Sequence, residues 1–512
     1  MLRAGRNIAR LVVIVWTLAR FDALYPLEVA GFELVAKALR RLAMRGPVAG
    51  RVGERLAAAL HALGPSFIKL GQALSTRPDL VGEAIADDLA NLQDRLPPSP
   101  GTAARRIVEA ELGAPIDSLF SDFEDHAVAA ASIAQVHHAT TSDGRQVAVK
   151  VLHAGVEDAF AADVELFYWL AGLVERAQPA LRRLRPVEVV GIFADSVALE
   201  MDLRFEAAAA SELRENLAGD EGFYIPEIDW QRTAQRVMTI ERIEGIPIDE
   251  HDAIIEAGHD VDAVLEKASR AFFNMVFRDG FFHADLHPGN LFVNSEGDIA
   301  AVDFGIMGRL DRETRHYLAE MLLGFLTGDY ARVARIHFEA GYVPADKSTE
   351  AFTQACRSIG EPIIGKPLNE ISLGQLLAQL FQVTATFEME TQPQLLLLQK
   401  TMLLAESIGR RLNPEVNLWF LAQPLIETWV IDNLGPEAKL RDSVGDSVAL
   451  FQRLPRLLAD AEAILAAIAR GGVKLHPDTV AALAEARAKQ GGTLLPWALV
   501  VLLAAVVAAV AG

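Results

Sequence analysis

Three side chains that could bind a metal ion lie in two neighbouring segments. Asp285 and Asn290 stand five residues apart in HADLHPGN (283–290), and Asp303 begins an Asp-Phe-Gly tripeptide thirteen residues later. Carboxylate and amide oxygens suit Mg²⁺, and phosphoryl transfer requires metal-bridged phosphates and a group that orients the acceptor. We therefore predict Mg²⁺ ligands at Asn290 and Asp303, and an acceptor-orienting, catalytic role for Asp285.

A lysine upstream could grip the phosphates of a nucleotide. Lys150 ends Val-Ala-Val-Lys, where the valines alternate with residues of the other face, as in a half-buried strand. This run, 146–152, and the run 135–141 flank Ser-Asp-Gly, which predicts a hairpin. A strand followed by the loop motifs above matches the kinase pattern. The alternative is a solvated surface lysine.

The hairpin is preceded by alanines where a glycine-rich phosphate-covering loop is expected. Alanine leaves amides accessible but disfavours positive φ. We place four residues of this loop in the nucleotide site, where the Ser132 hydroxyl could donate to a phosphate, and add Glu241 from the predicted strand 236–243. The four loop residues are Ala130, Ala131, Ser132 and Ile133.

An ionic partner for Lys150 is expected on a nearby helix. Glu206 precedes four alanines, whose small size allows a helix to pack closely on a sheet, and Glu200 and Asp202 stand just upstream. Any of these acids could instead lie on the surface.

The elements around these residues predict an α+β, two-lobed, protein-kinase-like fold. Residues 1–95 are expected to be helical, a small sheet with helices follows, and helices dominate after 245. The expected divisions are a basic arm (1–55), a helical extension (56–100), an N-lobe with a helical insert (101–245), a helical C-lobe (246–430), C-terminal helices (431–492) and an anchor (493–512).

Charge and hydropathy indicate a membrane protein and argue against nucleic-acid binding. The net charge is −20, whereas residues 1–55 carry ten basic and four acidic side chains. The run 494–511 has no charge and predicts a transmembrane helix, with its upstream side facing the cytoplasm. The apolar run 11–19 is short and predicts an interfacial helix. The one cysteine, Cys356, excludes an internal disulfide.

Together these residues resemble the UbiB family of atypical kinase-like proteins associated with ubiquinone biosynthesis. Its most specific marks here are Lys-Leu-Gly-Gln (69–72), the alanine loop, and Glu-Met-Asp (200–202). The resemblance implies that Glu206 pairs with Lys150. It also implies that four residues of a regulatory pocket restrict the active site, namely Lys69, Gln72, Glu200 and Asp202. Ala284 replaces the arginine of ordinary protein kinases, and no Ala-Pro-Glu follows Gly305.

The expected function is that of an atypical kinase or ATPase that binds Mg²⁺ with ATP or ADP and supports ubiquinone biosynthesis. It would act at the cytoplasmic face of a bacterial inner membrane. Expected partners are membrane lipid, ubiquinone-biosynthesis enzymes or polyprenyl-phenol intermediates, and a second copy in a homodimer. Two alternatives are a small-molecule phosphotransferase of the aminoglycoside or choline kinase type, and a non-catalytic membrane scaffold switched by nucleotide.

Overall fold

The computed structural model describes residues 2–25, 33–43, 49–75, 81–90, 92, 98–177, 185–362, 382–384, 386–389, 392–415, 425 and 429. They belong to one compact unit, Met1–Ile431. The helices expected at 431–492 and the anchor expected at 493–512 lie outside the described residues, so both stay predictions. Among the helices that are described, none is both long enough and apolar enough to cross a bilayer.

The described part of the N-terminal extension is helical. Gly64 ends one helix with a φ of 105°, and Pro65 begins the next. Gly71 allows close packing, because a Cβ there would lie 2.7 Å from Leu92 Cδ2 and 2.9 Å from Leu60 Cδ1. The helices are α1 (Leu2–Arg20), α3 (Glu33–Ala43), α4 (Val52–Leu63), α5 (Pro65–Ser75) and α7 (Glu83–Ala90).

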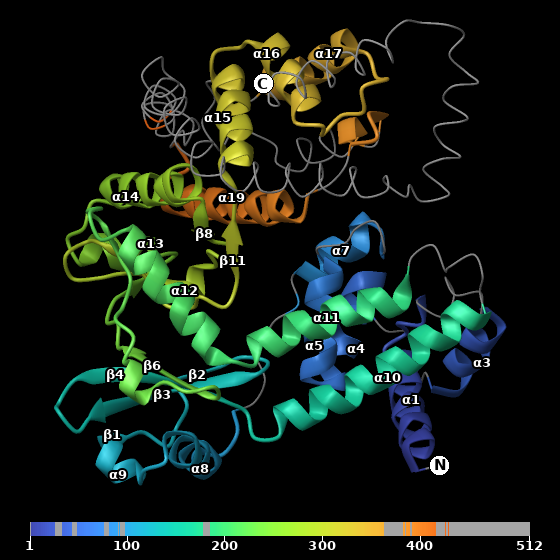
Figure 1. Ribbon diagram of the computed structural model, residues 1–512, viewed down its shortest axis with the longest axis vertical. Helices are drawn as coiled ribbons and strands as arrows, with labels where there is room; N and C mark the ends of the chain where they lie inside the picture. The colour runs from blue at the N-terminus through green and yellow to red at the C-terminus, as the bar shows by residue number, and fades with distance from the viewer. Residues whose placement is uncertain are drawn as a thin grey trace, which may run out of the picture. The chain divides into compact units, whose positions relative to one another are not determined.

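The N-lobe is built on an antiparallel sheet with strand order β1-β3-β4-β6, in which β2 also pairs with β3 (Figure 1). The valines of β4 are buried with apolar residues of α8, so Lys150 points to the opposite face, as the alternation predicts. The hairpin turns at Gly144, with a φ of 89°. The elements are α8 (Gly101–Leu112), α9 (Ile116–Leu119), β1 (Phe120–Phe123), β2 (Ala129–Ala130), β3 (Ala134–Thr141), β4 (Gln146–Leu152) and β6 (Val237–Glu241).

Among the described residues, three α-helices lie between β4 and β6. The first two, α10 (Val156–Ala177) and α11 (Pro186–Glu200), run side by side (Figure 1). The third, α12 (Leu203–Asn216), is capped by Asp202 and contacts β6. Its Ala207 and Ala210 are fully buried, so these small side chains bring α12 close to its neighbours. A short 3-10 helix, η2 (Trp230–Arg232), precedes β6.

Short strands in the C-lobe hold the loops that carry the site. The loop after β8 and the turn after β10 are joined through antiparallel pairing of β10 with β9 and of β11 with β8. The strands are β5 (Phe223–Tyr224), β7 (Ile246–Pro247), β8 (Phe281–His283), β9 (Leu291–Val293), β10 (Ile299–Ala301) and β11 (Met307–Arg309). The helical elements are α13 (His251–Glu256), α14 (Val261–Phe273), the π-helical segment η3 (Asn274–Asp279) and the 3-10 turn η4 (Pro288–Asn290).

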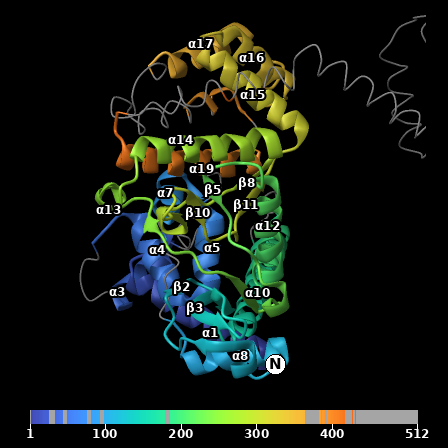
Figure 2. The same cartoon turned by 90° about the vertical axis from the view of Figure 1, so that its left-hand side faces the viewer.

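The chain becomes helical again directly after β11, so no long activation segment intervenes. The side chain of Asp311 caps the first of these helices by accepting from Thr314 N. Figure 2 shows α19 beside α14, and α19 also contacts β11. The helices are α15 (Arg312–Leu326), α16 (Tyr330–Glu339), α17 (Thr349–Gly360) and α19 (Pro393–Leu412).

Candidate nucleotide site

Lys150 lies between two carboxylates from distant parts of the chain. Its Nζ donates to Glu206 Oε1 and Oε2 at 2.6 and 2.8 Å, and to Asp303 Oδ1 at 3.2 Å. Glu206 also accepts from Phe304 N at 3.4 Å. These bonds join β4, α12 and the segment after β10. The pair between Lys150 and Glu206 that the family resemblance implied is therefore present.

Burial and the neighbouring charges shift the pKa values of Lys150, Glu206 and Asp303 in opposite directions. Burial raises the pKa of Glu206, although Lys150 opposes the change. Burial disfavours the charged form of Lys150, but Asp303 and Glu206 outweigh it, so the pKa of Lys150 is raised. Burial likewise opposes ionisation of Asp303, yet Lys150 and the Gly305 amide lower its pKa.

The loop between β8 and β9 carries Asp285 and Asn290, and it is fastened to the Asp303 segment. Ala284 N donates to Ile306 O, and Val302 N donates to Asn290 O, both at 3.0 Å. The Asn290 side-chain nitrogen donates to Asp285 O at 3.2 Å, which leaves Asn290 Oδ1 for a cation.

The Asp285 loop and the segment at Asp303 provide oxygens of the kind that magnesium binds. Asp303 Oδ1 accepts from Lys150 and, at 3.2 Å, from Gly305 N, so two donors position this carboxylate. Across the described residues, no group of three or more His, Cys, Asp or Glu side chains could hold a metal ion alone. Mg²⁺ is usually bound by one or two carboxylates together with water and substrate phosphates, and the side chains of Asp303 and Asn290 fit that kind of site.

His283 contacts the loop that carries Asp285, and no role for it was predicted from the sequence. Its ring is 1% exposed, its Nδ1 accepts from Asp285 N at 3.2 Å, and it packs edge-on against Phe304. Burial lowers the pKa of His283, so the ring is neutral and can act as that acceptor. The His283 ring thus links the Asp285 loop to the segment that begins at Asp303.

Lys400 was also missed by sequence analysis. Its Nζ donates to Asp285 Oδ1 at 3.0 Å from α19, across 115 residues of chain. The available signal was its position, because Lys400 is the only charged residue in PQLLLLQKTMLLA (393–405). Spacing alone could not have shown that this part of α19 reaches Asp285.

The alanine loop is tied to its surroundings by main-chain and histidine contacts. Ala130 belongs to β2 and pairs with Gln135, and Ala131 N donates to Ala134 O at 2.8 Å. His153 Nε2 lies 3.0 Å from Ala131 O, and His153 N donates to Ile133 O at 2.8 Å. The loop is therefore fastened to His153, the residue directly after β4.

The residue Ser132, expected to reach a phosphate, is fully buried in this conformation. Its Oγ has no hydrogen-bond partner among the described residues. An unpaired buried hydroxyl costs about 1–3 kcal/mol, so a bound acceptor at this atom would be stabilising. Ile133 beside it is also buried and belongs to the main core.

Glu241 lies at the end of β6, and its carboxylate binds neighbouring protein groups. Tyr224 Oη donates to Glu241 Oε2 at 2.6 Å, and Glu227 N donates to the same atom at 3.2 Å. Its backbone N donates to Glu227 O at 2.8 Å. The side chain thus fixes the loop at 224–227, and a role in nucleotide binding stays a prediction.

The four residues of the predicted regulatory pocket are only partly brought together. Lys69 Nζ of α5 lies 2.6 Å from Glu200 Oε2 at the end of α11. Asp202 is instead occupied by its own helix, where it accepts from Arg204 N and pairs with that guanidinium. Hydrogen bonding from Arg204 lowers the pKa of Asp202. Gln72 lies one turn beyond Lys69 on α5 and is partly buried.

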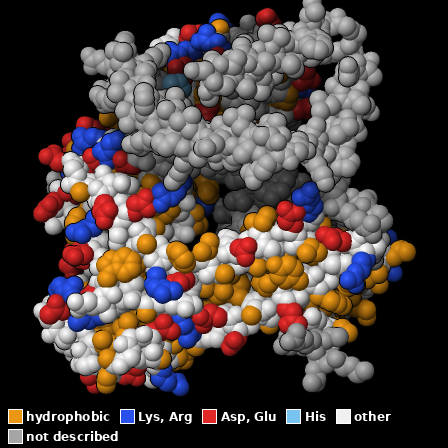
Figure 3. All heavy atoms as spheres, in the orientation of Figure 1, with side chains coloured by type: hydrophobic (Ala, Val, Ile, Leu, Met, Phe, Trp, Pro, Cys, Tyr) orange, Lys and Arg blue, Asp and Glu red, His pale blue; other side chains and the backbone are white. Residues whose placement is uncertain are grey.

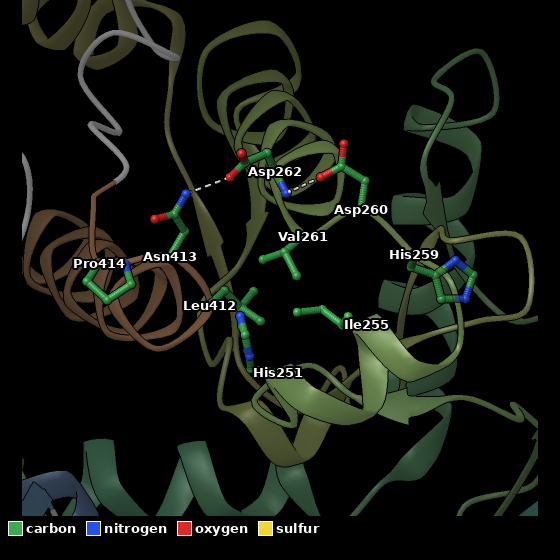
Figure 4. A pocket seen from close by; sticks show the side chains of 9 residues that line it. All are labelled: His251, Ile255, His259, Asp260, Val261, Asp262, Leu412, Asn413 and Pro414. Carbon is green, nitrogen blue, oxygen red and sulfur yellow. Dashed lines mark hydrogen bonds between the residues drawn. The ribbon is translucent and has the colours of Figure 1, made fainter.

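A separate cavity of about 350 Å³ lies between α13, the start of α14 and the end of α19 (Figure 4). The side chain of Asp262 accepts there from Asn413, and Asp260 caps α14. No residue predicted for the nucleotide site lines this cavity, so we do not connect it with the chemistry at Asp285.

A lysine on a sheet, its glutamate on a helix, and an Asp-Asn loop next to Asp-Phe-Gly define the protein class as kinase-like. Residues 91–337 match the model of the ABC1 atypical kinase-like domain, and residues 356–417 match the UbiB helical domain. The chain resembles the solved structure of Rv3197 with erythromycin from Mycobacterium tuberculosis, with a TM-score of 0.52 and 25% identity. That match covers 77% of this chain and 98% of the other.

Two curated relatives are each called "Probable protein kinase UbiB". The protein from Marinobacter nauticus is 44% identical over 416 residues, which is 80% of this chain and 76% of the relative. The protein from Aeromonas hydrophila is 46% identical over 391 residues, which is 75% of this chain and 72% of the relative. The chain therefore belongs to the UbiB family of atypical kinase-like proteins, as its motifs predict.

Proposed function

We propose that this chain binds Mg²⁺ with ATP and acts as an atypical kinase or ATPase that supports ubiquinone biosynthesis at a membrane. The observation that carries the proposal is the placement of Lys150. Its ammonium is fixed by Glu206 and Asp303, and Asp303 in turn is fastened to the loop of Asp285 and Asn290. Membership of the UbiB family supports the link to ubiquinone.

Each residue of the site has a role that its contacts favour. Lys150 would bind phosphate oxygens, since its charge is maintained at any physiological pH. Asp303 and Asn290 would hold Mg²⁺, which supplies charge neutralisation for the phosphates when it is bound. Asp285 would orient an acceptor hydroxyl or water through its carboxylate, 32% of which is exposed.

The test is Mg²⁺-dependent binding of a fluorescent ATP analogue to the Asp303→Asn chain. Losing this carboxylate's charge weakens a hard-cation site, so we expect at least about a tenfold loss of affinity with Mg²⁺. Asp298→Asn is a matched control, because Asp298 stands on the neighbouring β9–β10 hairpin and pairs with Lys267. Equal affinities for the parent and a folded Asp303→Asn chain would refute the proposal.

Steady-state hydrolysis separates an enzyme from a nucleotide-switched scaffold. We expect phosphate release by the parent chain to rise when anionic vesicles and a polyprenyl-phenol analogue are added. The vesicles represent the expected membrane lipid, and the analogue represents the expected polyprenyl-phenol intermediate. Binding without any turnover under these conditions would favour the scaffold instead. Restoration of ubiquinone in a bacterium that lacks its own UbiB tests the pathway directly.

We further propose that α1 and α3 contact the anionic surface of the membrane. The outward face of α1 is apolar, with Ile8 54%, Val12 61% and Trp16 51% exposed. Its Arg10 faces inward, where it binds Asp163 and stacks on Phe67. An ordinary surface helix turns its apolar side chains inward and its charged ones toward water. The apolar outward face of α1 and its inward Arg10 instead suit a helix that lies at a membrane interface.

The charges beside the apolar side chains favour α1 and α3, rather than the apolar face over α10 and α11, as the membrane contact. On α3, Leu34 and Leu42 are 85% and 75% exposed, and Lys37 and Arg41 are exposed beside them. Figure 3 shows apolar side chains along the face over α10 and α11 as well. However, α11 carries three acids and no Lys or Arg, so anionic headgroups would repel it.

Vesicle flotation tests this contact in a chain truncated before Leu494, which removes the predicted anchor. We expect Val12→Asp to lower binding to vesicles that contain phosphatidylglycerol, because it places a negative charge in the apolar face. The exposed Ile192 on α11 provides the control, and Ile192→Asp is expected to bind as the parent does. Equal binding of both variants would exclude α1 as the contact. The expected homodimer stays a prediction.

A further inference from the structure

Lys400 of α19 places a cation on the acceptor side of the site. This helix lies outside the segments that carry Lys150, Asp285 and Asp303. Lys400 Nζ donates to Asp285 Oδ1 at 3.0 Å, and the Lys400 side chain is 42% exposed. Of its three N–H donors, only this one has a partner among the described residues. The two that remain are available to a ligand that approaches Asp285.

Its helix holds Lys400 at this position by apolar packing on either side. Leu398 is 6% exposed and belongs to the main core, and Thr401 is fully buried with its hydroxyl on Leu397 O. The helix α19 packs against α14 and β11, next to the strand that leads to Asp285. The backbone at 400 is thus anchored, and only the flexible end of the lysine reaches the loop.

The catalytic loop itself provides no cation on this side. The segment 283–290 has no Lys or Arg, and His287 Nδ1 accepts from Gly289 N. Lys150, which would bind phosphate oxygens in the proposed function, comes from β4 and not from this loop. Sites that bind a transferable phosphoryl group place Lys, Arg or Mg²⁺ around its oxygens, because negative charge is concentrated there.

We propose that Lys400 is a ligand for the terminal phosphate of a bound nucleoside triphosphate. The ammonium would bind an oxygen of that phosphate while keeping its bond to Asp285, so that the carboxylate and the phosphate do not repel each other. This inference rests on the proposed nucleotide site. It adds that a helix of the UbiB helical domain, residues 356–417, completes that site.

The proposal predicts that Lys400 contributes to the affinity for a nucleoside triphosphate and not to the affinity for a diphosphate. Lys400→Met removes the charge and keeps much of the volume. We expect the full-length chain to lose about tenfold in affinity for a non-hydrolysable ATP analogue with Mg²⁺, while ADP affinity stays within about twofold. Lys400→Arg, which retains a cation, should restore most of the preference for the triphosphate.

Lys267→Met is the matched control, because Lys267 also pairs with an aspartate of the C-lobe, Asp298, and is partly exposed. It should leave the ratio of the two affinities at the parental value. If Lys400 only stabilises the fold, Lys400→Met lowers the melting temperature and leaves the ratio unchanged, and the proposal is overturned.

A second measurement needs no variant. The exposed ammonium of Lys400 should react with an amine-modifying reagent, and mass spectrometry measures the extent of reaction at this residue. We expect the triphosphate analogue to protect Lys400 several-fold more than ADP does. Equal protection by both nucleotides would overturn the proposal. If the parent binds neither nucleotide, the proposed function fails first, which distinguishes that failure from this one.

Discussion

Glu206→Gln should destabilise the folded chain far more than an equivalent change elsewhere on the same helix. The Lys150 and Glu206 side chains are only 15% and 8% exposed, and two short hydrogen bonds join them. Glutamine keeps the size and one acceptor but removes the negative charge. The ammonium would then remain buried with Asp303 as its only carboxylate, at 3.2 Å.

The magnitude follows from this remaining contact. Removing one partner of a buried ion pair typically costs about 3–5 kcal/mol. Because Asp303 still compensates part of the charge, we expect the lower end, about 3 kcal/mol. Glu212 is the matched control on α12, since it pairs with Arg309 of β11 but both side chains are well exposed. Glu212→Gln should cost no more than about 1 kcal/mol.

Urea denaturation followed by tryptophan fluorescence measures both free energies of unfolding on the full chain. We expect a clearly lower midpoint for Glu206→Gln than for Glu212→Gln, with similar slopes. Equal losses in the two variants would refute the reasoning. They would show that burial of the Lys150 pair contributes no more to stability than an exposed pair does.

Three further predictions follow from other contacts. Gly71→Ala should cost about 1–3 kcal/mol in urea denaturation, because its Cβ would press on Leu92 and Leu60. Burial lowers the pKa of His283 and of His337 in the folded chain, so the unfolded chain binds more protons. The melting temperature should fall as pH drops below about 6.5, and a flat profile would contradict this. Ala131→Gly, but not Ala131→Ser, should raise autophosphorylation with radiolabelled ATP, since only glycine adds backbone freedom.

Local patterns predicted the parts of the molecule that local sequence determines. The alternation around Lys150 predicted β4 and the face of its lysine, and the Ser-Asp-Gly turn predicted the hairpin of β3 and β4. Lys400 could not be predicted, because its contact depends on how α19 packs against α14 and β11. Asp202 caps α12, a contact that could be predicted only if the start of that helix were known, and its place in the regulatory pocket stays a prediction.

The restraint on the alanine loop lies partly outside the alanines. Gln135, which pairs with Ala130, accepts from Ser99 N at 2.6 Å and donates to Ser99 O at 3.2 Å. Ser99 Oγ also lies 3.2 Å from His153 Nδ1, the histidine whose other nitrogen contacts Ala131 O. Ser99 lies in the short segment 98–100 that directly precedes α8. Residues 98–100 are therefore joined to the alanine loop through Gln135 and His153, and these hydrogen bonds would persist if the alanines were replaced.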